Sequence, residues 1–494
     1  MNNFIDLIIF EMANNHQGSI SHAEYIIDKL GEVTRKYKLN AGVKFQYRDL
    51  DTLIHPNYKD STAIKHIQRF ISTRLSQNEF YGLVQMVKEQ GMTAICTPFD
   101  EASVSLCEDH GIDIIKIASC SATDYPLLEC IAKTQKPVII STGGKTIAEI
   151  DNIYNFFTHR NTVFALLHCI GIYPVQNNQL QLNVIEQMKT RYPGIPIGYS
   201  GHETQGNILV AQMAVAKGAT VFERHIGHAD KDIPLNAYST EVDDVEKWIL
   251  AIQDARNICG DKNKKTVSQT ELESLNELAR GCYSSKQLKR GEVITRDSVF
   301  FAMPYQAGQT MSGQYQDDMI ATKDYEVGEA IIEKRRATVV SDTRSIIHDI
   351  KGMLYESKVV IGNEFELELS HHYGMEHFRS TGATFISIIN REYCKKIIII
   401  LPSQKHPMHY HKVKEETFQV LSGVLLLQLE HETINIHPGE IYTIERGIVH
   451  AFTSAEGCIF EEISTTHVKN DSFYNDPKIA SIDMISRKTI LKDW

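Results

Sequence analysis

Lysine and hydroxyl side chains recur at the ends of short apolar runs in the first half of the chain. Two lysines stand in the motifs KFQ and KIAS, as Lys44 and Lys116. Hydroxyl side chains take similar positions at Thr97, Ser119, Ser141 and Ser200. Ammonium groups, hydroxyls and loop amides together bind a phosphate or a carboxylate. Neither lysine has an acidic neighbour in sequence, so an anion site is a better interpretation than two solvated surface charges.

Two histidines also follow apolar runs, His202 in GYSGH and His225 in ERH. Adjacent strands of a closed barrel lie ~4.8 Å apart, so side chains at their ends converge on one metal ion. A borderline cation such as Mn2+ suits two imidazoles completed by water and a substrate oxygen. Glu223, two residues before His225, favours a ligand role over a structural one. Glu11 ends the first run, where a carboxylate can bind hydroxyls or transfer a proton.

The apolar runs that carry these motifs are short and continuous. They span residues 7–10, 42–45, 92–96, 112–117, 138–140, 163–167, 195–199 and 220–222. Continuous apolar runs are typical of parallel strands buried on both faces. Amphipathic stretches separate them, for example 23–30, 77–88 and 205–216. This alternation over about 260 residues predicts an α/β fold, a (β/α)8 TIM barrel whose site lies at the C-terminal strand ends.

Length and composition exclude several classes of protein. A chain of 494 residues is too long for a single core. The net charge of -11 disfavours nucleic-acid and membrane-surface partners. There is no apolar run of the ~20 residues needed to span a bilayer, and the N-terminus lacks the basic start of a signal peptide. We expect a cytoplasmic protein.

The nine cysteines form neither a CxxC pair nor a disulfide framework. This usage indicates reduced thiols in a cytosolic compartment. Cys96, Cys120 and Cys169 fall near predicted strand ends. We expect them to be buried and inert rather than catalytic, because no base is assigned beside them.

Polar connectors and two smaller segments follow the predicted barrel. The stretch 261–271 indicates a linker, and a second connector is expected near 342–358. Between them lie short strands and turns, with the pattern K-x-G-E-x-I-x-x-D-x-V at 289–299. From residue 359 onward, short β runs separated by turn signals indicate a small β-barrel or sandwich. We expect three domains, at 1–262, 282–338 and 357–494.

The strand-end motifs resemble those of the sialic acid synthase family, which condenses phosphoenolpyruvate with an aldose to give a 3-deoxy-2-ulosonic acid. The shared motifs are N-N-H-x-G, K-F-Q, T-P-F-D, K-I-x-S, S-T-G, L-L-H-C-x-x-x-Y-P, G-Y-S-x-H and E-R-H. Residues 283–334 resemble that family's C-terminal antifreeze-like (SAF) domain. The resemblance implies a domain-swapped homodimer in which this domain caps the partner's barrel.

The same resemblance implies roles for individual residues. Phosphoenolpyruvate would be held by Lys44, Thr97, Lys116, Ser119, Ser141 and Ser200. His202 and His225 would bind Mn2+, or Mg2+ or Co2+ in its place. Glu11, Tyr173 and Glu223 would face the open-chain sugar. The expected catalytic set is Glu11, Lys44, Lys116, Tyr173 and Glu223.

Several sugar-side positions depart from the family pattern. Where the family has aspartate, asparagine, arginine or glutamate, this chain has Ser121, Gly171, Gly201, Leu235 and Met303. The phosphoenolpyruvate and metal positions keep the pattern. We therefore expect condensation with an aldose other than N-acetylmannosamine. The alternative is a non-catalytic sugar-binding or scaffolding protein of polysaccharide biosynthesis, which the retained lysine, histidine and glutamate set argues against.

The C-terminal segment carries a second candidate metal site. His409 and His411 alternate on one predicted strand, so both point into the same interior. With Glu416 and His450 they form H-x-H-x4-E-x6-G followed by P-G-x10-H, which resembles the two cupin motifs. Three histidines and one glutamate suit Mn, Fe, Zn or Ni.

The surrounding residues of this segment, KVKEETFQVLSG and ELSHHYG, are similar to the cupin D-lyxose ketol-isomerases. That similarity places Lys412 or Lys414, and Glu415, near a sugar. A metal-dependent sugar isomerase and a sugar-binding module remain open as alternatives for this domain.

Overall fold

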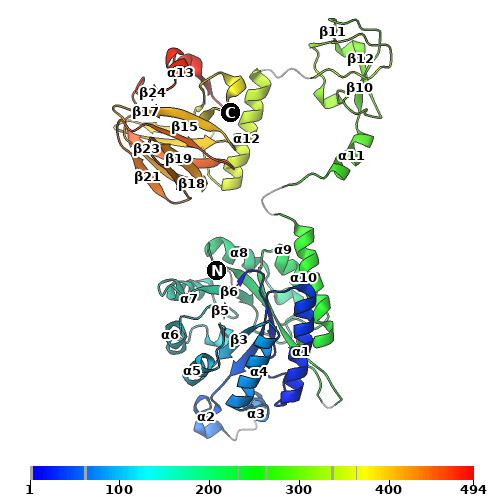
Figure 1. Ribbon diagram of the computed structural model, residues 1–494, viewed down its shortest axis with the longest axis vertical. Coiled ribbons are helices and arrows are strands. Elements are labelled where there is room, and N and C mark those ends of the chain that lie inside the picture. Colours follow the sequence, from blue (N-terminus) through cyan, green and yellow to red (C-terminus); the bar gives the residue numbers. More distant parts are fainter. Residues whose placement is uncertain (1–3, 60–63, 232, 262–264, 335–338, 363) are drawn as a thin grey trace. The chain divides into compact units, whose positions relative to one another are not determined.

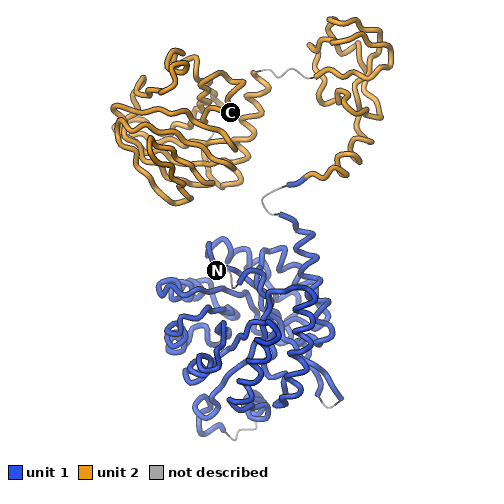
Figure 2. The backbone as a smooth tube through the Cα atoms, viewed as in Figure 1, with its two compact units in different colours: residues 1–266 blue, residues 267–494 orange. Residues whose placement is uncertain are grey.

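The structure is a computed structural model that describes residues 4–59, 64–231, 233–261, 265–334, 339–362 and 364–494. It separates into two compact units, residues 1–266 and 267–494 (Figure 2). Residues 262–264 of the predicted linker and 335–338 of the predicted second domain lie outside the described residues.

The first unit contains a closed parallel barrel, which confirms the predicted fold (Figure 1). Neighbouring strands pair in chain order, and β8 pairs with β1 to close the ring. Its strands are β1 (Ile8–Glu11), β2 (Ala41–Tyr47), β3 (Thr93–Pro98), β4 (Ile114–Ile117), β5 (Val138–Ser141), β6 (Phe164–Cys169), β7 (Ile197–Gly201) and β8 (Val221–Gly227). The predicted runs fall on these strands but often end before the polar residues that complete them.

Helices follow the strands and bury one apolar stripe each against them. They include α1 (Ile20–Tyr37), α4 (Gln77–Glu89), α5 (Glu101–Asp109), α6 (Tyr125–Lys133), α7 (Ile147–Thr158), α8 (Asn183–Arg191), α9 (Leu209–Ala216) and α10 (Val245–Cys259). Local chemistry fixes where some of them begin. Ser76 with Glu79 forms a capping box before α4, and Thr146 with Glu149 forms one before α7.

The second unit begins with a helix where a linker was expected, α11 (Gln269–Leu278). It continues with small antiparallel pairs, of β10 (Gly281–Ser284) with β12 (Val299–Ala302) and of β11 (Val293–Ile294) with β13 (Met319–Ile320). Cys282, Ile294, Met319 and Tyr325 belong to a separate core of this segment.

The expected connector near 342–358 is wrong, because those residues form the helix α12 (Val339–Ser357). Ile346, Ile350 and Leu354 make a stripe that packs with Ile397 and Ile399 of the following β region. Apolar residues at every fourth position form a stripe on one face of the helix, and most of its other residues are polar. The segment therefore has the polar composition of a connector although it is a helix.

The rest of the chain forms two β-sheets, as predicted. One has the order β21-β18-β23-β16-β15-β14-β25 and the other β20-β19-β22-β17-β24. The strands that carry the second site are β17 (Lys405–Tyr410), β18 (Glu416–Gly423) and β22 (His450–Thr453). The other strands of the two sheets are β14 (Leu367–His371), β15 (Gly382–Asn390), β16 (Tyr393–Ile400), β19 (Leu425–Leu429), β20 (Thr433–Ile436), β21 (Ile441–Ile444), β23 (Cys458–Thr465), β24 (Phe473–Tyr474) and β25 (Lys488–Leu491). On β16, Ile397 and Ile399 face α12, whereas Ile398 and Ile400 join the core between the sheets.

Within the described residues, no helix has both the length and the apolar character that crossing a bilayer requires.

Candidate functional site

Strand alternation points the predicted site residues into the barrel. On β1, Ile8 and Phe10 pack beneath the helices while Ile9 lies in the inner core, so Glu11, in phase with Ile9, faces inward at the C-terminal mouth. The same alternation applies to the other strand-borne candidates, Lys44, Thr97, Lys116, Ser141, Ser200, Glu223 and His225.

Lys44 lies between two carboxylates at this mouth. Its ammonium makes a close ion pair with Glu11 and lies 3.1 Å from Glu223 Oε1. The register explains the contacts, since Glu11 is paired with Lys44 on β2 and with His225 on β8. The lysines have no acidic neighbour in sequence, but Glu11 and Glu223 are acidic partners of Lys44 in space.

Lys116 supplies a second buried ammonium. Its Nζ donates hydrogen bonds to Ser141 Oγ at 2.6 Å and to the Ile117 carbonyl at 3.0 Å, and it lies 3.9 Å from Glu223 Oε2. Ser200 Oγ donates to Glu223 Oε1 at 2.8 Å. The two lysines therefore share one carboxylate.

Two further hydroxyls differ in how they are bonded. Thr97 is 1% exposed, yet its Oγ1 has no hydrogen-bond partner in the described part of the chain. Ser119, half-buried, accepts a hydrogen bond from the Gly143 amide at 3.0 Å. A buried hydroxyl without a partner costs free energy, so Thr97 fits a position that a ligand completes.

Burial and charge set the protonation of this cluster. Burial lowers the pKa of Lys44 to about 8, against the opposing pull of Glu223. Burial pushes the pKa of Glu223 upward, but the charges of Lys116 and Lys44 outweigh it and hold that pKa at about 2. Near neutral pH the mouth therefore contains the ionised Glu223 carboxylate beside the Lys44 ammonium.

His202 and His225 lie beside this cluster, with ring centroids 5.4 Å apart. His202 Nδ1 donates to the Ile170 carbonyl at 2.8 Å, which leaves Nε2 as the nitrogen open to a metal. Burial lowers the pKa of both rings, so both are neutral and able to ligate. This donor pair fits a divalent cation that takes imidazole and water ligands.

Tyr173 covers the two histidines from the outside. Its ring centroid lies 4.0 Å from that of His202 and 6.3 Å from that of His225, and 53% of the residue is exposed. Tyr238 lies 5.1 Å from both His225 and Tyr173. An aromatic edge therefore borders the metal-compatible pair.

Sequence inspection missed the ion pair that supports this mouth, Arg224 with Glu203. Both side chains are 1% exposed and in close contact. Arg224 also donates to the Thr204 and Gln205 carbonyls at 3.0 and 3.1 Å. The acidic residue after G-H and the basic residue in E-R-H were visible signals, but nothing in sequence pairs them.

The cysteine expectation holds in part. Cys96 and Cys169 are buried, and burial raises the pKa of both thiols, which makes them poor nucleophiles. Cys120 is exposed, so the prediction of burial is wrong there. It lies in the short 3-10 helix Ser119–Ser121, which follows β4.

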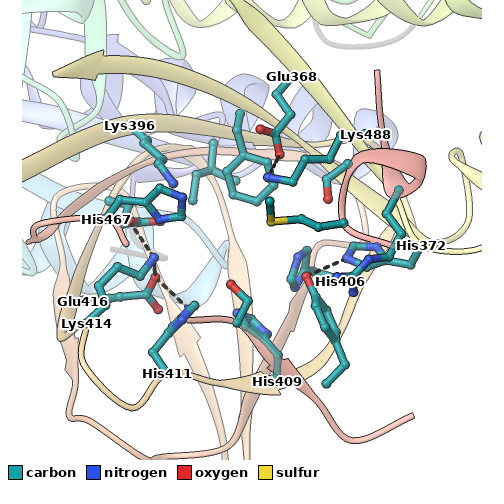
Figure 3. A pocket seen from close by; sticks show the side chains of 18 of the residues that line it. Glu368, His372, Lys396, His406, His409, His411, Lys414, Glu416, His467 and Lys488 are labelled. Atoms are coloured by element: carbon teal, nitrogen blue, oxygen red, sulfur yellow. Dashed lines mark hydrogen bonds and ion pairs between the residues drawn. The ribbon is translucent and has the colours of Figure 1, made fainter. Parts of the chain in front are cut away.

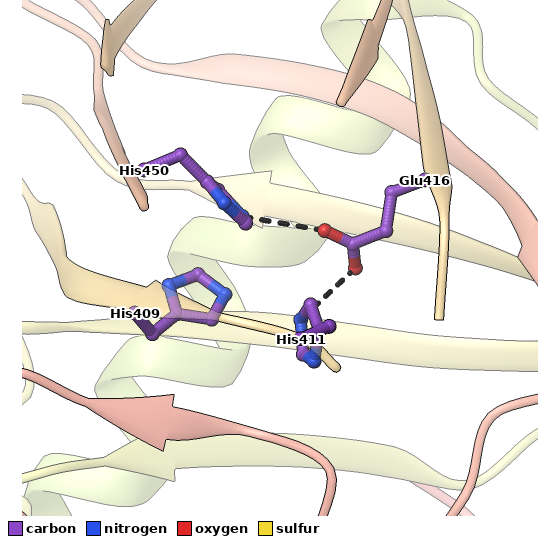
Figure 4. Close-up of side chains that lie close together, drawn as sticks. All are labelled: His409, His411, Glu416 and His450. Carbon is purple, nitrogen blue, oxygen red and sulfur yellow. Dashed lines mark ion pairs between the residues drawn. The ribbon is translucent and has the colours of Figure 1, made fainter. Parts of the chain in front are cut away.

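The second candidate site brings together His409, His411, Glu416 and His450 (Figure 4). All four are buried, and one potential ligand atom from each lies within 4.8 Å of the others. Glu416 Oε1 lies 3.4 Å from His411 Nε2, and Glu416 Oε2 lies 3.3 Å from His450 Nε2.

Each histidine of this group is oriented through its other ring nitrogen. The Nδ1 atoms of His409, His411 and His450 donate to the carbonyls of Pro407, Asp471 and Ile448, at 3.0, 2.6 and 3.0 Å. The three Nε2 atoms are left to converge with the Glu416 carboxylate. This arrangement fits a divalent metal with three imidazole ligands and one carboxylate.

Asp471 was not among our predicted site residues. It holds the loop between His411 and Glu416. Its carboxylate accepts hydrogen bonds from the amides of Lys412, Val413 and Lys414 at 2.8–3.1 Å. Its carbonyl accepts the proton of His411, so a single residue positions the loop and one imidazole.

A cavity of about 180 Å³ adjoins the group (Figure 3). Lys414 lines it and pairs closely with Glu416 and with Glu462 Oε1 at 3.1 Å. Of the predicted alternatives Lys412 and Lys414, it is Lys414 that lines the cavity, whereas Lys412 and Glu415 are exposed and lie outside this lining.

The fold and the site define a TIM-barrel protein with a charged, imidazole-bearing mouth, followed by a β-rich region with its own His/Glu group. Residues 36–264 match the NeuB family, and residues 396–460 match the cupin domain. The chain belongs to the NeuB family and carries a cupin domain in addition.

Individual relatives cover the first two thirds of the chain. A crystal structure of a Chromobacterium violaceum protein, provisionally named spore coat polysaccharide biosynthesis protein E, is 40% identical, has a TM-score of 0.63, and matches 66% of this chain and 98% of that one. The N,N'-diacetyllegionaminic acid synthase of Campylobacter jejuni is 28% identical over 66% of this chain and 99% of that enzyme. An uncharacterized protein of Methanocaldococcus jannaschii is 32% identical over 60% of this chain and 84% of its own length.

Proposed function

We propose that the barrel condenses phosphoenolpyruvate with an open-chain aldose to form a 3-deoxy-2-ulosonic acid and phosphate. The observation that carries the proposal is the convergence of Lys44, Lys116 and Glu223 beside His202 and His225 at one barrel mouth. The relative that makes N,N'-diacetyllegionaminic acid supports a sugar-acid product.

Each group at the mouth has a role in this proposal. Lys44 and Lys116 neutralise the carboxylate and phosphate of phosphoenolpyruvate. Thr97, Ser119, Ser141 and Ser200 complete the anion site with hydroxyls. Tyr173, at the exposed rim, borders the sugar.

His202 and His225 would hold Mn2+, or Mg2+ or Co2+. When bound, such a cation supplies Lewis-acid polarisation of the aldehyde oxygen. The two histidines themselves fix its place next to Glu223, and Tyr173 shields them from bulk water.

The reaction balances with water as the third reactant. The enol carbon of phosphoenolpyruvate forms a bond to the aldehyde carbon, whose oxygen takes up a proton. Water adds to the resulting cationic C2, the C2–O bond to phosphate breaks, and C2 becomes a ketone. Glu11 or Glu223 orients the water or moves its proton, while Lys44 and Lys116 stabilise the departing phosphate.

The sugar is proposed to differ from N-acetylmannosamine. Gly171 has nothing within 4 Å of a built Cβ, and Leu235 presents a hydrocarbon side chain against Gly227. Neither offers the polar group that the family pattern has at that position. A panel of aldoses assayed for phosphate release tests this point, and preference for N-acetylmannosamine over every other sugar would contradict it.

The function itself is tested by phosphate release from phosphoenolpyruvate with Mn2+ and each aldose. We expect release that requires an aldose, with a product whose mass equals that of aldose plus pyruvate. No release with any sugar, together with retained sugar binding, would support the scaffolding alternative.

We further propose three domains, at 1–262, 282–338 and 357–494, of which the second is SAF-like and caps the barrel of a second subunit in a homodimer. Its separate core of Cys282, Ile294, Met319 and Tyr325 supports an independent segment. Light scattering tests the dimer. Mixing a chain that lacks residues 282–338 with a barrel-inactive Lys116→Met chain should restore activity if the domain acts in trans.

For the cupin we propose a sugar ligand, with isomerisation or binding alone as the two possibilities. The buried Lys414 between Glu416 and Glu462 supports the isomerase, because proton transfer next to a metal needs such groups. Aldose–ketose interconversion by the full chain without phosphoenolpyruvate separates the two. Conversion that is lost in His450→Ala supports the isomerase.

A cytoplasmic location is also proposed. All nine cysteines are free thiols, as is usual in a reducing compartment. Thiol titration of the denatured protein purified from its own host without reductant would reveal disulfides if this were wrong.

A further inference from the structure

The cupin cavity has more cationic than anionic side chains. Its lining contains Lys396, Lys414, Arg487 and Lys488, but only three carboxylates, those of Glu368, Glu416 and Glu462. A divalent metal at the histidine group would add to this excess of positive charge.

Two of the four cations are neutralised by the protein. Lys414 contacts Glu416 and lies 3.1 Å from Glu462. Lys488 lies 2.8 Å from Glu368 Oε1. These pairs use all three carboxylates of the lining.

Lys396 and Arg487 are left over. Lys396 is 8% exposed, and its Nζ lies over the ring of Phe385, 5.6 Å from the ring centroid. Arg487 lies over Tyr474 at 5.0 Å, and its Nε and Nη1 are buried without a hydrogen-bond partner. Among the described residues, neither has a carboxylate within ion-pair distance.

Nearby imidazoles respond to this charge. Burial lowers the pKa of His467 to about 3, with Lys396 as the next cause. Burial also lowers the pKa of His372 to about 3, with Arg487 as the next cause. Both rings are neutral, so they add no charge of their own.

A buried ammonium without a partner is costly, and such positions are usually completed by an anion. Figure 3 shows Lys396 and Lys488 on one side of the cavity and His409 and His411 on the other. A ligand that fills the cavity therefore meets the metal-compatible group on one side and the unpaired Lys396 on the other, and Arg487 lines the same cavity.

We propose that the cupin binds an anionic monosaccharide, whose carboxylate or phosphate pairs with Lys396 or Arg487 while its oxygens face His409, His411, Glu416 and His450. The inference rests on the proposed sugar-binding role of the cupin and specifies its substrate class. A sugar phosphate would be supplied by a kinase-type reaction upstream of the barrel. A sugar acid would be of the same class as the barrel's proposed product.

The test is calorimetric titration of the Mn2+-loaded full chain with matched probes that differ at one carbon. These are D-mannose, D-mannose 6-phosphate and D-mannuronate, with N-acetylneuraminate as a ulosonic acid and inorganic phosphate as an anion without a sugar. Lys396→Met keeps the stem length and removes the charge, and Arg487→Gln is a second, independent variant. Lys395→Met is the control, because Lys395 pairs with Glu461 instead of lining the cavity.

We expect at least one charged sugar to bind about tenfold or more tightly than D-mannose, the gain expected of a charge-assisted contact. Lys396→Met or Arg487→Gln should remove that preference, and Lys395→Met should keep it. Whichever of D-mannose 6-phosphate and D-mannuronate binds more tightly shows whether the anionic group of the ligand is a phosphate or a carboxylate.

Equal binding of neutral and charged sugars would overturn the inference, as would inorganic phosphate binding as tightly as the charged sugars. If no sugar binds, the proposed sugar role of the cupin falls too. Phosphate release by the barrel, assayed on the same samples, shows whether the condensation proposal stands independently.

Discussion

The Glu203 carboxylate occupies the space that a side chain at position 201 would need. A Cβ built on Gly201 lies 2.6 Å from Glu203 Oε2 and 2.9 Å from Oε1. Glu203 is held there by Arg224 and by Tyr199, whose hydroxyl donates to Oε2 at 2.8 Å. Position 201, where the family pattern has aspartate, is therefore glycine in this chain because the buried Glu203–Arg224 ion pair takes up the space for a side chain.

Gly201→Ala should destabilise the barrel by about 1–3 kcal/mol, because the added methyl group overpacks a rigid neighbour. Unfolding can be followed by the fluorescence of Trp248 in a Trp494→Phe background, since these are the two tryptophans. Gly206→Ala is the matched control, with nothing within 4 Å of its built Cβ. Equal stability of the two variants would refute the explanation.

The rate with phosphoenolpyruvate should fall in alkaline solution. The Lys44 pKa of about 8 means that the free enzyme loses this ammonium as pH rises through that value, and the neutral amine does not attract the substrate. kcat/KM should drop about tenfold per pH unit above the pKa. Lys44→Arg should keep its charge and move the decline to higher pH, whereas an unchanged decline would assign it to another group.

Lys44→Met should lower kcat/KM for phosphoenolpyruvate about a hundred- to a thousandfold, the usual loss for one charge-stabilising group. Lys136→Met, a lysine bonded to the Ile112 carbonyl instead of to a carboxylate, serves as a control for general effects of lysine removal. Similar losses in both variants would argue against a direct role.

Thr97→Val should raise KM for phosphoenolpyruvate without loss of stability. The buried Oγ1 has no hydrogen-bond partner among the described residues, so its removal costs no hydrogen bond within them and should delete only a contact to the ligand. We expect KM to rise about tenfold. Thr162→Val removes another buried unpartnered hydroxyl, at the start of β6 and away from the mouth, and should leave KM unchanged; equal effects would contradict the assignment.

Asp471→Ala should weaken metal binding by the cupin about ten- to a hundredfold, as loss of a group that orients metal ligands does. The measurement is Mn2+ or Zn2+ release to a chelator in a His202→Ala/His225→Ala background, which isolates the cupin site. Asp483→Ala is the control, because that exposed residue only caps the Ile485 amide. Unchanged affinity in Asp471→Ala would mean that the loop holds its shape without the carboxylate.

The positions of the barrel residues could be predicted because alternation along a strand is local. The inward phase of Ile9 and Glu11, or of Ile114 and Lys116, follows from sequence once the fold is known. The contact of Lys44 with Glu223 could not be predicted, because it depends on β8 closing against β1 across more than two hundred residues. The Arg224–Glu203 pair spans only 21 residues, but no spacing rule connects the two side chains.

In the cupin, the ligand pattern was visible because His409 and His411 are two residues apart on one strand. Asp471 lies sixty residues from His411, and no spacing rule connects them. The helix α12 was missed because its apolar stripe is narrow. The stripe covers Ile397 and Ile399 of β16, and this packing is seen only once the helix and the strand are placed together.

The central claim is condensation of phosphoenolpyruvate with an aldose by cleavage of the C2–O bond. It is tested most directly with phosphoenolpyruvate that carries a heavy oxygen isotope in the bridging position, incubated with the full chain, Mn2+ and an aldose panel. We predict that phosphate appears only when an accepted aldose is present and that it retains the label. Labelled oxygen left in the ulosonic acid or in pyruvate, or release that does not depend on any aldose, would contradict the account.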